Sequence, residues 1–292
     1  YLLGNDDLLI GTVLVTEPMK SFYRNGDGDE VLYIHYGTGK IESMFGSITY
    51  RPGDYVTLPI GTIYRLIPTE TTKILFVESF SQITTPKRYR NEYGQLLEHS
   101  PFCERDIRGP EELETFNEKG EFEVLTKTRG FIHSHILGHH PLDVVGWDGY
   151  LYPWVFNIED FEPITGRVHQ PPPVHQTFEG HNFVICSFVP RLYDYHPEAI
   201  PAPYYHSNVN SDELLYYVEG NFMSRKGIKK GSITLHPSGI PHGPHPGTTE
   251  ASIGKKETLE LAVMIDTFRP LKVVKKAKAI EDKNYMFTWI EK

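Results

Sequence analysis

Residues 213–242 read ELLYYVEGNFMSRKGIKKGSITLHPSGIPH, and the spacing within this stretch decides the fold class. Glu213 is followed after six residues by Gly220, and the run between them is apolar and aromatic, as in a buried strand. A second run opens at Gly231 with five residues, a proline, one residue, a glycine, two residues and then His242. Glycine and proline in these places are typical of turns, so the stretch predicts two strands bounded by turns.

The same frame occurs earlier in the chain, at residues 30–64. Glu30 is followed after six residues by Gly37, and Gly53 opens a second run with the same intervals, which ends at Tyr64 instead of histidine. Two frames with matched internal spacing indicate an internal repeat rather than unrelated turns. We therefore expect two copies of one β-rich unit.

The composition favours strands over helices. The 292 residues include 18 tyrosines and 16 phenylalanines, which suit strands, and 22 prolines and 25 glycines, which are many for a helical protein. The best helical candidate is the stretch 110–116, which opens with proline and continues with acidic residues. Many short apolar runs between turn residues are typical of barrels and sandwiches.

Both frames resemble the signature motifs of the cupin barrel, in which Glu-x6-Gly is followed by Gly-x5-Pro-x-Gly-x2-His. The resemblance implies an all-β fold, a bicupin of two jelly-roll barrels with few short helices. We expect an N-terminal barrel without metal over residues 1–85, a connecting and interface segment over 86–180, and a C-terminal metal-binding barrel over 181–292.

Charge and hydropathy exclude some classes of partner. The formal net charge of −9 disfavours nucleic acid, because phosphate binding needs a basic face. No apolar run approaches the roughly 18 residues of a membrane helix, so we expect no membrane partner. Cys103 and Cys186 are the only thiols and predict no disulfide framework. With no recognisable signal peptide, the cytoplasm is the expected location.

Three polar residues of the second frame are candidate metal ligands. His206 lies seven residues before Glu213, and His242 closes the frame. Two histidines and one carboxylate can occupy one face of an octahedron and leave positions for substrate and O2, as in non-heme Fe(II) oxygenases. If they only lined a barrel, the buried charge would still need a partner. Asp212 is an alternative carboxylate, but Glu213 alone keeps the six-residue interval to Gly220.

The first frame lacks this ligand set. Asn25, Asp27 and Glu30 stand in its first motif, and Tyr64 replaces the closing histidine. We therefore interpret the N-terminal barrel as structural.

At a finer level the chain resembles the homogentisate 1,2-dioxygenase family. The family's motifs are Asn-Ala-Asp-Gly-Asp, Val-Val-Gly-Trp-His-Gly, Pro-Tyr-Tyr-His-Arg-Asn, Ser-Leu-His and Thr-Pro-His-Gly-Pro. The matching segments here, in the same order, are NGDGD at 25–29, VVGWDG at 144–149, PYYHSN at 203–208, SITLH at 232–236 and PHGP at 241–244.

The resemblance implies a homohexameric bicupin that uses Fe(II) and O2 to cleave the ring of homogentisate, 2,5-dihydroxyphenylacetate, to maleylacetoacetate in tyrosine degradation. Carried over by position, the iron ligands would be His206, Glu213 and His242, and His236 would line the active site. We accordingly expect a homo-oligomer, either a trimer or a hexamer.

This sequence departs from the family at three places. Asp148 stands where the family has a histidine base, Phe222 stands where it has a substrate-contacting tyrosine, and one extra residue separates His206 from Glu213. These changes leave the prediction of iron binding intact and weaken the prediction of the exact substrate and of the proton-transfer step.

We expect a ring-cleaving dioxygenase acting on homogentisate or a closely related dihydroxylated aromatic acid. Iron would bind the ionised hydroxyl of the substrate beside O2, and Asp148 or His236 would accept a phenolic proton. Tyr204, Tyr205 and Phe222 would shape an aromatic pocket around the substrate, with core packing as their alternative role.

Two alternatives stay open at this point. The iron enzyme could act on another hydroquinone, such as gentisate or unsubstituted hydroquinone. A non-catalytic bicupin that binds a ligand is the other, although a pure binding module needs no open metal face. In the enzyme, His236 and His242 would also contact the substrate.

Overall fold

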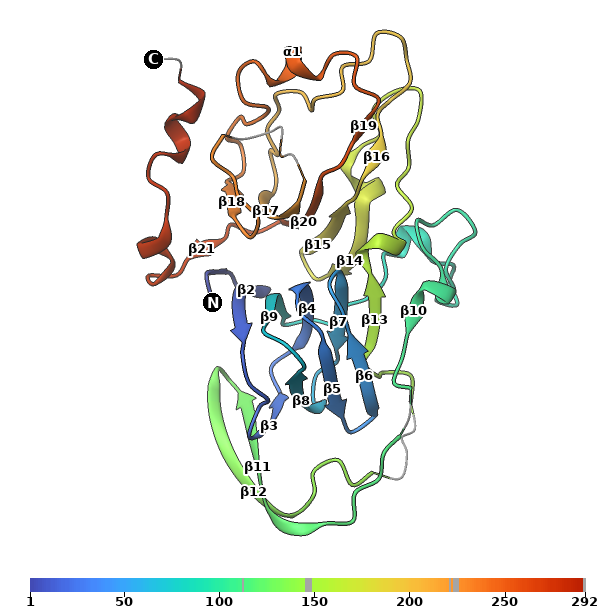
Figure 1. Cartoon of the computed structure of the whole chain (residues 1–292), viewed down its shortest axis with the longest axis vertical. Coiled ribbons are helices and arrows are strands. Elements are labelled where there is room, and N and C mark those ends of the chain that lie inside the picture. Colours follow the sequence, from blue (N-terminus) through green and yellow to red (C-terminus); the bar gives the residue numbers. More distant parts are fainter. Residues whose placement is uncertain (112, 145–148, 221, 223–225, 291–292) are drawn as a thin grey trace. The chain divides into compact units, whose positions relative to one another are not determined.

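The apolar runs that the sequence marks as strands do form strands, and these build two sets of sheets (Figure 1). The structure is a computed structural model that describes residues 1–111, 113–144, 149–220, 222 and 226–290. Within these residues the helical content is one α-helix, α1 (Thr248–Ser252), and short 3-10 turns. The all-β class is therefore confirmed.

The chain divides into two compact units. The first comprises residues 1–83 and 103–160, and the second comprises residues 84–102 and 161–292. The stretch that the sequence analysis treats as one connecting segment thus contributes to both units. None of the helices in the described part of the chain is long and apolar enough to span a membrane.

The first unit contains two sheets, whose strands pair antiparallel except for the parallel pair of β3 and β11. One sheet runs in the order β10 (Ile107–Arg108), β13 (Trp154–Asn157), β7 (Asp54–Leu58), β4 (Asp29–Tyr36), β9 (Thr72–Ser79), β2 (Leu8–Val15), β1 (Leu3–Gly4). The other runs β12 (Phe131–His139), β11 (Lys119–Thr128), β3 (Phe22–Asn25), β8 (Ile63–Pro68), β5 (Gly39–Ser43), β6 (Gly46–Tyr50). The 3-10 turns are η2 (Glu104–Asp106) and η3 (Ile158–Asp160).

The core of this unit lies between its two sheets. Leu32, Val56 and Ile74 come from one sheet, Ile41 and Tyr64 come from the other, and all five are buried in one hydrophobic cluster. Alternate residues of each strand reach this cluster, which is the arrangement of a sandwich or barrel interior.

The second unit has one larger sheet and a two-stranded one. The larger sheet runs β14 (Gln176–Gly180), β15 (Phe183–Phe188), β20 (Leu261–Thr267), β17 (Asp212–Glu219), β18 (Ile233–His236), all antiparallel. The small sheet pairs β16 (Arg191–Leu192) with β19 (Glu257–Thr258). The remaining elements are β21 (Lys272–Val273), η1 (Lys87–Tyr89), η4 (Pro172–His175), η5 (Ala277–Ile280) and η6 (Tyr285–Trp289).

The sequence repeat has the same strand register in both units. The pair Glu30–Leu58 of the first unit corresponds to Glu213–His236 of the second. In the same way Glu30–Glu78 corresponds to Glu213–Asp266. The pair Tyr23–Tyr64 corresponds to His206–His242. The turn glycines also match, because Gly53, Gly61, Gly231 and Gly239 all have positive φ. The predicted bicupin fold therefore corresponds to a backbone repeat, with a barrel frame in each unit.

One sequence prediction is wrong. The described residues of 110–116, all but 112, form no helix. Glu111 instead donates its backbone N–H to Ser47 O at 3.2 Å, and the Phe116 ring stacks on His140 with a centroid separation of 4.0 Å. These tertiary contacts outweigh the weak local preference of one turn for a helix.

Candidate metal centre

The three predicted ligands converge in the second unit. The metal-binding atoms of His206, Glu213 and His242 all lie within 4.8 Å of one another. Glu213 and His242 are buried, whereas His206 is partly exposed. Two imidazoles and a carboxylate with one partly open side are a donor set that suits a divalent transition metal such as Fe(II).

The turn before His242 brings the two histidines together. Gly239 has a φ of +76°, which few other residues adopt, and its N–H donates to Asn208 O at 2.8 Å. His206 and His242 then exchange backbone hydrogen bonds of 2.9 and 2.8 Å, which leaves their ring centroids 4.4 Å apart. Glu213 reaches the same place from β17.

Glu213 is the electrostatic centre of the cluster. Its Oε1 lies 2.8 Å from His236 Nδ1 and 3.5 Å from His242 Nε2, and its Oε2 accepts a hydrogen bond from Asn208 at 3.2 Å. Burial by itself would raise the pKa of Glu213. The hydrogen bonds from His236 and His242 outweigh burial and hold this pKa well below its usual range, so the carboxylate is ionised at neutral pH.

A second carboxyl lies opposite Glu213 in the register, on β20. Burial, followed by the charge of Glu213, raises the pKa of Asp266 to about 7. Asp266 Oδ1 is buried and has no hydrogen-bond partner among the described residues. A site with an ionised carboxylate, a second buried carboxyl and two imidazoles is short of positive charge, and a bound cation would compensate it.

A residue that the sequence analysis missed lies against this cluster. Tyr285, in η6, has its hydroxyl 3.1 Å from His236 Nε2. The His236 ring in turn stacks on His242, with centroids 4.3 Å apart and planes 16° apart. His245 Nε2 lies 2.7 Å from Thr288 O and holds the same C-terminal turn. No motif marks Tyr285, because its role arises from tertiary contact alone.

The predicted aromatic residues are spread around the site. Tyr204 is exposed and its ring meets His206 edge-on at 5.4 Å. Tyr205 is exposed as well and borders Gly243. Phe222 contacts Tyr217, with a centroid distance of 4.7 Å. Asp148, the predicted base, lies outside the described residues.

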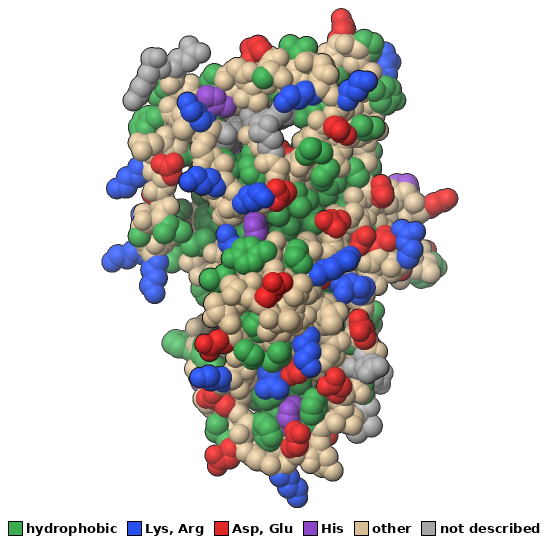
Figure 2. All heavy atoms as spheres, in the orientation of Figure 1, with side chains coloured by type: hydrophobic (Ala, Val, Ile, Leu, Met, Phe, Trp, Pro, Cys, Tyr) green, Lys and Arg blue, Asp and Glu red, His purple; other side chains and the backbone are tan. Residues whose placement is uncertain are grey.

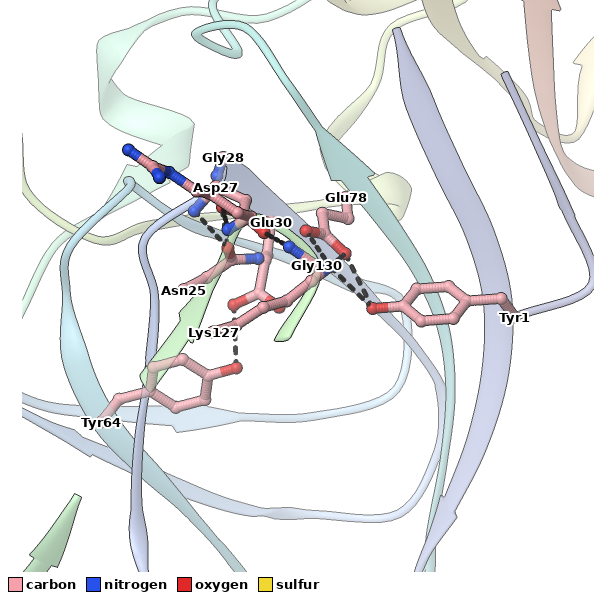
Figure 3. Close-up of polar contacts among 10 residues, drawn as sticks. Tyr1, Asn25, Asp27, Gly28, Glu30, Tyr64, Glu78, Lys127 and Gly130 are labelled. Atoms are coloured by element: carbon pink, nitrogen blue, oxygen red, sulfur yellow. Dashed lines mark hydrogen bonds and ion pairs between the residues drawn. The ribbon is translucent and has the colours of Figure 1, made fainter. Parts of the chain in front are cut away.

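The first unit has tyrosines where the second has histidines, and Figure 3 shows one of them, Tyr64, beside Glu30. Tyr23, Glu30 and Tyr64 take the register positions of His206, Glu213 and His242. Tyr64 donates its hydroxyl proton to Glu30 Oε2 at 3.0 Å. Burial, opposed by that hydrogen bond and assisted by Glu78, raises the pKa of Glu30 to about 7.

Lys127 supplies the positive charge of this polar cluster. Its ammonium forms a buried ion pair with Glu78, the register counterpart of Asp266, and lies 3.1 Å from the Tyr1 hydroxyl. Tyr1 also donates a hydrogen bond to Glu78 at 2.8 Å. The cluster therefore satisfies its carboxyl groups with protein donors.

Comparison with known proteins shows the family. The model named homogentisate 1,2-dioxygenase N-terminal matches residues 4–158, and the C-terminal model of the same family matches residues 160–291. The chain belongs to the homogentisate 1,2-dioxygenase family. The resemblance seen in the sequence is thereby confirmed, and family membership supports a ring-cleaving dioxygenase.

Two curated proteins and one solved structure match most of this chain. A protein of Saccharolobus solfataricus, named only as a candidate dioxygenase, is 46% identical over 99% of this chain and 75% of its own length. A homogentisate 1,2-dioxygenase of Nitrobacter hamburgensis is 28% identical over 94% of this chain, which spans 64% of that enzyme. A cupin 2 conserved barrel domain protein from Leptotrichia buccalis aligns over 91% of this chain and 86% of its own, at 13% identity and a TM-score of 0.40.

Proposed function

We propose that the protein is an Fe(II)-dependent ring-cleaving dioxygenase acting on homogentisate or a closely related dihydroxylated aromatic acid. One ring carbon–carbon bond breaks, and both atoms of O2 enter a maleylacetoacetate-type product. The observation that carries the proposal is the convergence of His206, Glu213 and His242 in a chain of this family. The same arrangement argues against a binding module without catalysis, because a metal held by two histidines and one carboxylate would keep coordination positions free for substrate and O2.

The three residues would hold the iron, and their neighbours would orient them. When bound, Fe(II) supplies the redox chemistry between ring and O2 and acidifies the phenolic hydroxyl that binds it. Glu213 contributes an ionised oxygen, and His236 orients this carboxylate through its Nδ1. Tyr285 restrains the other side of the His236 ring. Such outer partners tune the affinity of metal ligands.

Proton transfer from the substrate requires a separate base. Both ring nitrogens of His236 have neighbours within 3.1 Å, Glu213 on one side and Tyr285 on the other, which favours an orienting role for His236. We therefore propose Asp148 as the base, from its place in the family motif. Tyr204 would border the substrate beside His206.

Oxygen uptake measured against a panel of substrates tests the proposal. Protein loaded with Fe(II) without air should consume O2 with homogentisate, or with a close relative such as gentisate, in one-to-one proportion to the ring cleaved. If none of the dihydroxylated aromatic acids supports O2 uptake, the function that remains is ligand binding without catalysis.

Two further properties are proposed from the family. We propose a homo-oligomer, a trimer or hexamer, and light scattering that shows a monomer at micromolar concentration would contradict it. We propose small aromatic acids and O2, not nucleic acid, as partners. On the face seen in Figure 2, basic and acidic side chains alternate and form no continuous basic patch.

A further inference from the structure

One face of the second unit's larger sheet extends from Glu213 to a group of aromatic side chains. On β17, Glu213 lies opposite Asp266 of β20, and Tyr217, four residues further along, lies opposite Ala262 of β20. On its other side, Ala262 lies opposite Phe188 of β15. Residues four apart on a strand, and residues directly opposite across a pair, share a face. Phe188 therefore lies on the Glu213 face, about 13 Å further along it.

Arg191 lies at this aromatic end and is partly buried. Its guanidinium lies over the Phe188 ring, 5.6 Å from the centroid. No described residue accepts a hydrogen bond from this guanidinium or forms an ion pair with it within 4.0 Å. Burial lowers the pKa of Arg191, and the more distant charges of Glu260 and Asp194 oppose that shift only in part. A partly buried guanidinium of this kind can bind an anion that reaches it from solution.

His175 packs against the same ring. Its imidazole is 4.6 Å from the Phe188 centroid and only 5% of the residue is exposed. Its Nδ1 is buried and has no hydrogen-bond partner among the described residues. Burial, together with the nearby Arg191 charge, lowers the pKa of His175 to about 3, so the ring is neutral and one of its nitrogens carries a proton to donate.

The two groups share Phe188 and complement each other chemically. A guanidinium binds a carboxylate through paired N–H donors, and a neutral imidazole can add a third donor. Phe222, on Tyr217, adds an aromatic surface at the same level of the face.

We propose that Arg191 and His175 form a subsite for the carboxylate of the aromatic substrate. This inference rests on the proposed function, because it assigns the acidic arm of the molecule whose hydroxyl would meet the metal ligands. It makes the anionic substituent the basis of selection. Unsubstituted hydroquinone and uncharged derivatives would then be poor substrates.

Calorimetric titration with phenylacetate and with phenylacetamide tests the subsite apart from catalysis. Neither probe has a phenolic hydroxyl, so binding does not depend on ring cleavage. The wild-type protein should prefer phenylacetate, and Arg191→Met should weaken phenylacetate binding roughly 50-fold while leaving phenylacetamide binding unchanged. Arg191→Lys keeps a charge without the fork and should lose less. Arg269→Met, at an exposed arginine of the same unit, is the matched control and should change neither.

A second measurement needs no variant. If the wild-type enzyme cleaves the methyl ester of its substrate as efficiently as the free acid, measured as kcat/KM, or binds both probes equally, the subsite is wrong. Phenylacetate binding that survives Arg191→Met in a folded protein overturns it as well. The proposed function fails separately: it fails if no dihydroxylated aromatic supports O2 uptake, even where phenylacetate binds through Arg191.

Discussion

Tyr64 takes the register position in the first unit that His242 takes in the second. Each pairs antiparallel with the residue seven positions before the frame's glutamate, Tyr23 in one case and His206 in the other. The backbone frame is therefore the same, and the side chains alone distinguish the candidate metal-binding donor set of the second unit from the hydrogen-bonded set of the first. Under the proposed function, one copy of the repeat would serve catalysis and the other would serve stability.

Replacing Lys127 with Met should destabilise the protein by about 3–5 kcal/mol, because Glu78 would keep a buried charge without its partner. Urea unfolding measures the change. Lys230→Met is the matched control: its ion pair with Glu219 is exposed, so its loss should cost no more than about 1 kcal/mol. Combining Lys127→Met with Glu78→Gln should recover part of the loss. Equal effects of Lys127→Met and Lys230→Met would contradict this account.

Glu30 should give stability a dependence on pH. Its pKa is about 7 in the folded protein and near 4.5 in an unfolded chain, so between these values the folded state binds more protons. The contribution of Glu30 to the free energy of unfolding therefore falls as pH rises from about 4.5 to about 7, and it is constant above pH 7. Glu30→Gln should remove that slope. Parallel pH profiles for wild type and variant would contradict the burial of this carboxyl as a neutral acid.

Tyr285→Phe should weaken Fe(II) binding roughly 10-fold, because His236 loses the hydroxyl that restrains it and orients Glu213 less well. A competition titration with a metal chelator under anaerobic conditions measures this. Tyr93→Phe, at an exposed tyrosine in the same unit, should leave the affinity unchanged. Unaltered affinity in Tyr285→Phe would reduce Tyr285 to a packing residue.

Asp148→Asn should lower turnover roughly 100-fold or more if Asp148 is the base, because an amide cannot accept the phenolic proton. Steady-state O2 uptake across pH measures it. A carboxylate base stays ionised to lower pH than a histidine, so wild-type activity should extend further into acid than a histidine base allows. Unchanged turnover in the Asn variant would return the role to His236.

Sequence spacing predicts the repeat and the ligand set because both depend on local rules. The intervals between glutamate, glycine and proline determine where strands turn, and strand register then aligns Glu213 with His236. The contacts of Lys127 and Tyr285 could not be predicted in this way, since both residues reach their clusters from distant segments without a motif. The prediction of a helix over 110–116 was wrong for the same reason, because Glu111 and Phe116 contact Ser47 and His140, which are distant in the sequence.

The proximity of Arg191 and His175 to one ring illustrates a further limit. A histidine in a proline-rich segment and an arginine after a strand are ordinary in a sequence. Only their shared contact with Phe188 and the burial of His175 distinguish them from surface residues. Unsatisfied donors are visible in a structure but not in a pattern.

We propose that the second unit binds one Fe(II) through His206, Glu213 and His242. The most direct measurement is the iron content per chain of protein loaded and desalted without air, with folding checked by circular dichroism. We predict one iron per chain in the wild type and in Tyr64→Phe, and none in His242→Ala, which should also consume no O2. A folded His242→Ala variant that retains one iron per chain would contradict the ligand assignment.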